Sequence, residues 1–87
     1  MPVVHIPSPL YSYTKNRPEV DADGETIGAI LEDLDRRYPG IRFRVVDEQG
    51  RIRPTLLFYV NGQVTRTLAQ TVAGTDEVHI IAALSGG

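Results

Sequence analysis

The sequence predicts an α+β domain in which a single helix lies across one face of a mixed β-sheet. Three observations predict this class: one segment with helical spacing of its apolar residues, several short segments with strand alternation, and Gly, Asn and Pro turn signals between them. The 87 residues are 41% hydrophobic and 23% charged, an ordinary globular composition. A domain of this size buries only ~60–65% of its unfolded surface. Because this leaves little room for an internal catalytic cleft, we expect a chain that folds alone and is not an enzyme.

The first two predicted strands form a hairpin. Val3–Ile6 has strand alternation, and Pro7 and Pro9 end it because proline lacks a backbone donor. A loop follows to Lys15. A second strand is predicted at Arg17–Ala22, where it runs back beside the first.

A helix is predicted from Thr26 to about Tyr38. Asp23-Gly24 marks a turn before it, and the Thr26 hydroxyl can accept a hydrogen bond from an otherwise unpaired N–H of the first turn. Pro39-Gly40 ends the helix. Acid-before-base pairs at i,i+4 are expected between Glu32 and Arg36 and between Asp33 and Arg37. The apolar stripe that would lie on the sheet is Ile27, Ile30, Leu31, Leu34 and Tyr38.

A long connection, residues 41–53, follows the helix and carries a turn at Glu48-Gln49-Gly50. Its arginines could meet an acidic partner or a phosphate. We expect a solvated face instead, because Asp47 and Glu48 lie among them. The arginines are Arg42, Arg44, Arg51 and Arg53.

Three strands complete the predicted sheet. Thr55–Val60 is the clearest strand, and Asn61-Gly62 after it is a strong hairpin signal, so a short partner strand should begin near residues 63–64. A turn at residues 73–76 leads into the last strand, Glu77 to about Ala83. The inward phase of these elements predicts a core of Val4, Ile6, Ile27, Ile30, Leu31, Leu34, Phe58, Val60, Val78 and Ile80.

The chain ends in Leu84-Ser85-Gly86-Gly87, directly after a strand. Glycine has no Cβ, so a Gly-Gly end fits a channel that is too narrow for other residues. The strand ties this end to the body, so docking of the body would deliver the terminal carboxylate to a defined place. Glycine-rich ends are also common as inert termini. The placement after a strand favours a body of residues 1–83 and a flexible tail of residues 84–87, with the Gly87 carboxylate as the reacting group.

Composition excludes several other classes. The net charge of −2 argues against a general nucleic-acid binder, and we expect a solvated loop rather than a base-stacking platform around Tyr11, Tyr13, Lys15 and Arg17. The sequence has no cysteine, which excludes disulfides and thiolate metal sites. No apolar run approaches the roughly 20 residues of a membrane span, and the first residues lack a basic signal region. We therefore expect a cytoplasmic protein with no nucleic-acid or membrane partner.

Three segments together resemble the ubiquitin-like β-grasp proteins, and specifically the ThiS/MoaD family of sulfur carriers. They are Asp23–Gly28 at the start of the helix, Phe58–Gly62 at the hairpin, and Asp76–Val78 leading to Gly86-Gly87. Family members commonly have proline in the last strand and Ala-Gly-Gly at the end, where this chain has Ala82-Ala83 and Ser85. The long segment after the helix resembles carriers of cysteine biosynthesis, and some molybdopterin-synthase small subunits, more than the shorter thiamine-pathway carriers.

The resemblance implies a carrier that is a co-substrate and not a catalyst. It implies that a ubiquitin-activating-like adenylyltransferase uses ATP to adenylate Gly87. A sulfide donor or a sulfurtransferase persulfide then forms a thiocarboxylate, and a sulfur-accepting synthase takes the sulfur. The carrier itself would bind no cofactor. It could also be the small sulfur-carrying subunit of a synthase such as molybdopterin synthase.

Two other interpretations stay open. In one, the chain is a protein modifier joined through Gly87 to target lysines, as ubiquitin is. Because both need the same adenylation, the sequence does not separate the modifier from the sulfur carrier. In the other, the chain is a plain β-grasp interaction module whose terminal glycines are inert.

Alternation also places apolar residues on the sheet face away from the helix. Leu57, Tyr59, His79 and Ile81 share this phase, and we expect them to form the docking patch for the partner enzymes. The resemblance implies that the first and last strands pair, which would make His5 and His79 neighbours. Without a cysteine or an obvious third donor, we expect surface histidines that flank the patch, and no metal site.

Overall fold

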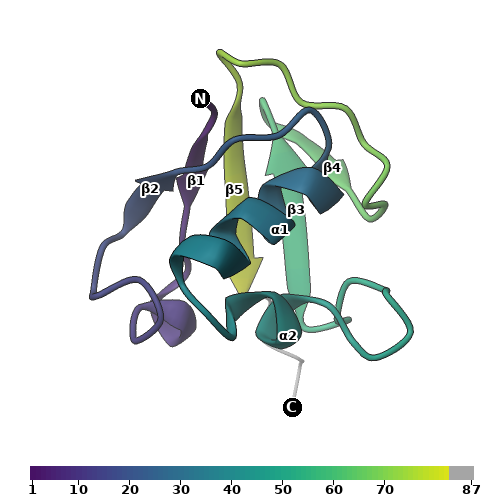
Figure 1. The fold of residues 1–87 in the computed structure, drawn as a ribbon. Coiled ribbons are helices and arrows are strands. Elements are labelled where there is room, and N and C mark those ends of the chain that lie inside the picture. Colours follow the sequence, from purple (N-terminus) through teal and green to yellow (C-terminus); the bar gives the residue numbers. More distant parts are fainter. Residues whose placement is uncertain (83–87) are drawn as a thin grey trace.

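The computed structural model describes residues 1–82 and contains a five-stranded mixed sheet with one long helix across one of its faces (Figure 1). The strand order is β2-β1-β5-β3-β4. The α+β class expected from the sequence is confirmed. None of the helices within residues 1–82 is long and apolar enough to cross a membrane. The strands are β1 (Val3–His5), β2 (Glu19–Asp21), β3 (Leu56–Val60), β4 (Gln63–Thr65) and β5 (Glu77–Ala82).

The hairpin of β1 and β2 forms as predicted, although both strands are shorter than expected. They pair antiparallel, with Val4 opposite Val20. The segment between them is more ordered than a solvated loop, because it contains a 3-10 turn, η1 (Ser8–Leu10). Leu10 is buried, and Tyr11 and Tyr13 pack against the core. The tyrosine rings therefore fill gaps beside the sheet instead of standing in solvent, which argues against a base-stacking role.

The predicted helix is α1 (Ile27–Arg37), which begins where the sequence indicates. The Thr26 hydroxyl accepts a hydrogen bond from the Ala29 N–H at 3.1 Å and caps the first turn. The apolar stripe faces the sheet, with Tyr38 half-buried and the other four members buried. Gly24 precedes the helix at a point of close approach, where an added Cβ would lie 2.7 Å from the Ile30 nitrogen. A side chain at this position would collide with backbone, so the turn requires glycine.

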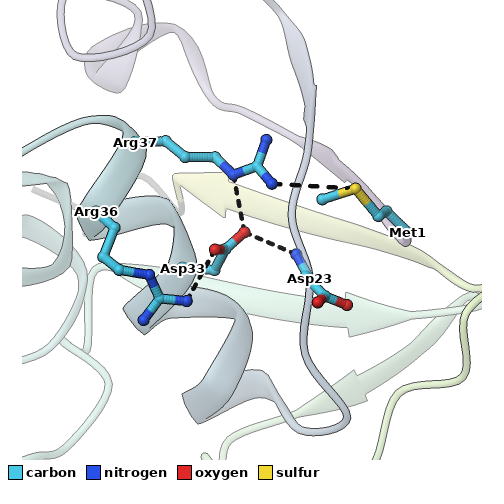
Figure 2. A network of polar contacts seen from close by, with 5 residues as sticks. All are labelled: Met1, Asp23, Asp33, Arg36 and Arg37. Atoms are coloured by element: carbon cyan, nitrogen blue, oxygen red, sulfur yellow. Dashed lines mark hydrogen bonds and ion pairs between the residues drawn. The ribbon is translucent and has the colours of Figure 1, made fainter.

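Asp33 ties α1 to the segment that enters it (Figure 2). Its carboxylate accepts hydrogen bonds from the Asp23 N–H at 2.8 Å, Arg37 Nε at 2.9 Å and Arg36 Nη2 at 2.9 Å. The Arg37 pair was predicted, whereas Arg36 pairs with Asp33 instead of with Glu32. The Asp23 N–H holds the pKa of the Asp33 carboxyl below its usual value, and the two guanidinium groups add to this effect against the opposing influence of burial.

The connection after α1 contains a second helix, which the sequence analysis missed. Gly40 has a positive φ of 97°, and α2 (Ile41–Val45) begins directly after it. Proline and glycine at 39–40 therefore mark a corner between two helices and not the start of an irregular segment. Ile41 and Val45 lie one helical turn apart and are both buried. The turn at residues 48–50 is present as predicted, closed by a bridge between Val46 and Ile52.

The remaining strands follow the predicted order. Asn61 and Gly62 have positive φ values of 51° and 83°, the geometry that a two-residue hairpin loop requires, and they join β3 to β4. The last strand, β5, lies at the centre of the sheet between β1 and β3 (Figure 1). It pairs parallel with β1 and antiparallel with β3. The C-terminal strand is thus held by hydrogen bonds on both edges.

All ten residues predicted for the core are buried. The core is larger than predicted, because segments interpreted as loops also contribute to it. These additional residues are Leu10, Ile41, Val45, Val46 and Val72. Residues of the strands that share the inward phase but were not named are Val20 and Leu56.

Candidate functional site

The four residues predicted for the docking patch lie together on the open face of the sheet, the face away from α1. In the register of β3 and β5, Tyr59 is opposite His79 and Leu57 is opposite Ile81. Both strands alternate between buried and more accessible positions. Leu57, Tyr59 and His79 are half-buried, and Ile81 is 41% exposed. The four side chains form one block that covers two adjacent strands.

Val64 on β4 extends this block and was missed by the sequence analysis. It lies opposite Tyr59 in the register of β3 and β4, and it is 55% exposed. Its position follows from the Asn61-Gly62 loop, since a two-residue loop fixes the register of the strand that follows. We refer to Leu57, Tyr59, Val64 and Ile81 as the apolar patch. A cluster of half-buried and exposed apolar side chains of this kind is typical of a surface that binds a partner.

Histidines and carboxylates border the apolar patch on its other side. His5 is opposite His79 in the register of β1 and β5, and the two imidazole rings stack with centroids 4.0 Å apart and an interplanar angle of 5°. His5 Nε2 lies 2.7 Å from Glu77 Oε1, and His5 Nδ1 lies 3.5 Å from Glu19 Oε2. The predicted neighbours are therefore confirmed. Sequence reasoning missed Glu77 as a third polar group, although its i−2 spacing from His79 places both on one face of a strand.

The loop before β5 is fixed to the β3–β4 hairpin by Asp76 and Asn61. Asp76 accepts hydrogen bonds from the Ala73 N–H at 2.8 Å and from Asn61 Nδ2 at 2.6 Å, while the Glu77 N–H donates to Asn61 Oδ1 at 3.2 Å. The Ala73 N–H, and then the Asn61 amide, hold the pKa of the Asp76 carboxyl below its usual value. Both ends of the described part of β5 are thus fixed, since Ala82 pairs with Leu56 at the other end.

The predicted tail, Leu84, Ser85, Gly86 and Gly87, lies outside the described residues, as does Ala83. What the structure fixes is the strand that leads to it. Since β5 is central, the path of the chain up to Ala82 is set by hydrogen bonds to β1 and β3. The last described residue, Ala82, is therefore held within the sheet.

The basic segment after α1 is partly neutralised, as its sequence suggested. Asp47 accepts hydrogen bonds from the N–H groups of Gln49 and Arg51, and the Arg51 N–H is the main reason that the pKa of the Asp47 carboxyl is lowered. Arg53 donates to the Phe43 carbonyl and its guanidinium lies 5.1 Å from the centre of the Phe43 ring. These contacts account for the charged residues Asp47 and Arg53 by structural roles within the segment.

The architecture and the open face together identify the structural class of the protein. A small mixed sheet with a central C-terminal strand, one helix-covered face and one apolar face is the ubiquitin-like β-grasp arrangement. The chain matches the ThiS family over residues 4–87, so it belongs to that family. The family resemblance predicted from the sequence is confirmed.

Similar proteins fall into two groups, and the first consists of proteins named CysO. The chain is 36% identical to the sulfur carrier protein CysO of Mycobacterium tuberculosis over 97% of this chain and 96% of that protein. The crystal structure of that CysO, described as an antigen, has a TM-score of 0.91, with 34% identity over 97% of this chain and 100% of the other. CysO in the BexX/CysO complex of Amycolatopsis orientalis also has a TM-score of 0.91, with 30% identity over the full length of both chains.

The second group consists of small archaeal modifier proteins. SAMP1 from Haloferax volcanii has a TM-score of 0.75 and 26% identity, covering 98% of this chain and 97% of that one. The fold is therefore shared between a protein named a sulfur carrier and a protein named a modifier.

Proposed function

We propose that this protein is a sulfur carrier whose terminal carboxylate, on Gly87, becomes a thiocarboxylate. One observation carries the proposal: the match to the ThiS family extends to Gly87 itself, and it is supported by the likeness to CysO over nearly the whole of both chains. The central position of β5 supports a tail that is delivered by the body. The protein is a co-substrate in this scheme, since the bond that changes is at its own terminus.

The chemistry needs activation, because a carboxylate is a poor electrophile. A ubiquitin-activating-like adenylyltransferase would join the Gly87 carboxylate to the α-phosphorus of ATP and release pyrophosphate. The sulfur of a sulfide donor or of an enzyme persulfide then attacks the carbonyl carbon and displaces AMP. With sulfide, the product is the thiocarboxylate. With a persulfide, an acyl disulfide forms first, and a thiol must reduce it to release the thiocarboxylate. Because ATP is consumed, we place this chemistry in the cytoplasm.

The partners would be proteins that bind the open face while the tail enters their active site. CysO of Amycolatopsis orientalis is found in a complex with BexX, and this supports a protein partner that binds the present chain during the reaction. We assign the apolar patch and His79 to this contact. A sulfur-accepting synthase would use the same face after the adenylyltransferase has left, because both must reach the same tail.

The likeness to CysO favours delivery of sulfur to cysteine biosynthesis over the molybdopterin pathway. A role as the small subunit of a synthase would instead require a lasting complex with a large subunit. Co-purification of the natively expressed chain distinguishes these, since a co-substrate is isolated largely alone.

A second candidate function is protein modification through Gly87, which the likeness to SAMP1 supports. The two functions share adenylation and differ in the nucleophile. Sulfur attack gives a thiocarboxylate, whereas attack by a lysine amine gives an isopeptide bond and leaves the carrier on a target.

The test is intact mass spectrometry of the tag-free protein after incubation with the cognate adenylating enzyme, ATP and sulfide. We expect one carboxyl oxygen to be replaced by sulfur, and we expect no change when ATP is omitted. A protein that never acquires sulfur, but appears as isopeptide-linked adducts in lysate of its native host, would identify a modifier instead. A protein that does neither would be an inert module.

A further inference from the structure

We propose that the open face carries a binding site for a divalent zinc ion, formed by His5, Glu77 and His79. Each residue offers one ligand atom, and these atoms all lie within 4.8 Å of one another. The site lies beside the apolar patch, and the proposal does not depend on the sulfur chemistry.

The backbone positions the three side chains without any loop. His5 and His79 are paired residues of adjacent parallel strands, β1 and β5, and Glu77 is two residues before His79 on the same strand. Paired residues and residues two apart project from the same face of a sheet. Hydrogen bonds along both edges of β5 keep these positions fixed, so the three donors are presented by a rigid surface.

The donor set suits zinc. Two imidazole nitrogens and one carboxylate oxygen form a His₂Glu set, which occurs in zinc sites that keep a fourth position open. Zinc binds such donors at about 2.0–2.2 Å, which places donors about 3.3 Å apart in a tetrahedral arrangement. His5 Nε2 and Glu77 Oε1 are already 2.7 Å apart. The stacked imidazole rings must rotate to turn their lone pairs toward a common point, and both rings are partly accessible to solvent while Glu77 is exposed.

Glu19 supplies a second feature of a metal site. When a histidine binds a metal through one ring nitrogen, its other nitrogen commonly donates to a carboxylate, which fixes the tautomer and the ring orientation. His5 directs Nε2 toward Glu77. Its other ring nitrogen, Nδ1, lies 3.5 Å from Oε2 of Glu19 on β2. Zinc at Nε2 would require the tautomer with the proton on Nδ1, and Nδ1–H would then face the Glu19 carboxylate. Glu19 is therefore assigned as a positioning residue for His5.

Diffuse attraction of zinc to the negative charge of the open face is the alternative that must be tested, because the same face also carries Asp21. Asp21 is exposed on β2, opposite Val3, and is not one of the grouped donors. Asp21→Asn and Glu77→Gln each remove one negative charge from the open face. The two variants form a matched pair in which only Glu77→Gln changes a ligand group, replacing its carboxylate by a neutral amide.

The experiment is calorimetric titration of the tag-free full chain with zinc chloride, together with NMR of the histidine ring carbons. We expect one ion per chain and shifted ring signals from both His5 and His79. We expect His5→Ala, His79→Ala and Glu77→Gln to weaken binding by more than about tenfold, Glu19→Gln to weaken it by about tenfold, and Asp21→Asn to leave it nearly unchanged. Magnesium, which prefers oxygen ligands in octahedral geometry, should not compete.

Circular dichroism of each variant checks that the sheet is intact, and Glu77→Gln keeps the test valid if a histidine variant does not fold. Equal losses in Asp21→Asn and Glu77→Gln would overturn the proposal in favour of diffuse attraction. Unshifted histidine signals, binding of several weak ions per chain, or displacement by magnesium would each overturn it as well.

Discussion

The two faces of the sheet are built by the same strands but have opposite roles. Phe58 and Tyr59 are neighbours in β3, yet Phe58 is 0% exposed beneath α1 while Tyr59 is half-buried on the open face. The helix-covered face consists of buried aliphatic side chains and the fully buried ring of Phe58, with partly buried tyrosines packed against them. The open face is a mixture of apolar, imidazole and carboxylate groups that are half-buried or exposed. This difference indicates that the covered face sets stability and the open face is available for binding.

The largest effect should come from the covered face. Phe58→Ala removes a fully buried ring, and we expect it to lower the free energy of unfolding by about 3–5 kcal/mol; Leu34→Ala on α1 should cost about 2–5 kcal/mol. Tyr59→Ala is the matched variant on the open face, and it should cost only about 1 kcal/mol through lost cross-strand contacts. Urea denaturation of the three variants checks this order. Equal losses at positions 58 and 59 would show that the two faces are not distinct.

A second prediction concerns Asp33, the buried carboxylate of α1. Because the pKa of Asp33 is lowered in the folded protein, its ionised form stabilises the fold above its unfolded value of 3.8, and this contribution is lost as the pH falls through the folded pKa. Asp33→Asn should therefore be less stable than the wild type by about 1–3 kcal/mol near neutral pH.

The difference between wild type and Asp33→Asn should shrink as the pH falls below about 4. Asp47 and Asp76 also have lowered pKa values, but they titrate in both proteins and cancel in the comparison. Glu32→Gln, an exposed position on the same helix, is the control. A stability difference for Asp33→Asn that does not change with pH would refute the assignment.

The third prediction concerns the apolar patch. Ile81→Asp places a charge where a partner would bury an exposed apolar side chain, and Tyr59→Ala removes the largest ring of the patch. Each change should weaken binding to the adenylating enzyme by about tenfold or more, the loss typical of a residue near the centre of an interface. Calorimetry of the complex measures this, with circular dichroism as the control for folding. Unchanged affinity in both variants would place the docking surface elsewhere.

Much of this arrangement was predictable from the sequence, because it follows from the periodic spacing of apolar residues along the helix and strands. The α1 stripe and the alternation in Val3–Ile6, β3 and β5 identified every predicted core residue. The alternation in β3 and β5 also placed Leu57, Tyr59, His79 and Ile81 on the other face. The Asn61-Gly62 loop was equally clear, because these two residue types readily adopt the positive φ that a two-residue hairpin loop requires.

What was missed depends on contacts between distant segments or on short elements. The helix α2 spans only Ile41–Val45, too short for a periodic signal, and is held by burial of its two apolar ends. Glu77 became relevant only when the pairing of β1 with β5 brought His5 to it, across 72 positions of sequence. Spacing along the chain does not show such a contact.

The central claim is that the body docks and the terminal glycine reacts, and it is tested most directly by intact mass after ATP-dependent sulfur transfer. The wild type should exchange one carboxyl oxygen for sulfur. The Gly87-deleted chain should fail, and Gly86→Val should fail too, since a β-branched side chain stiffens and widens the tail. Both variants should keep the thermal stability of the wild type. A Gly87-deleted protein that still acquires sulfur would contradict the account.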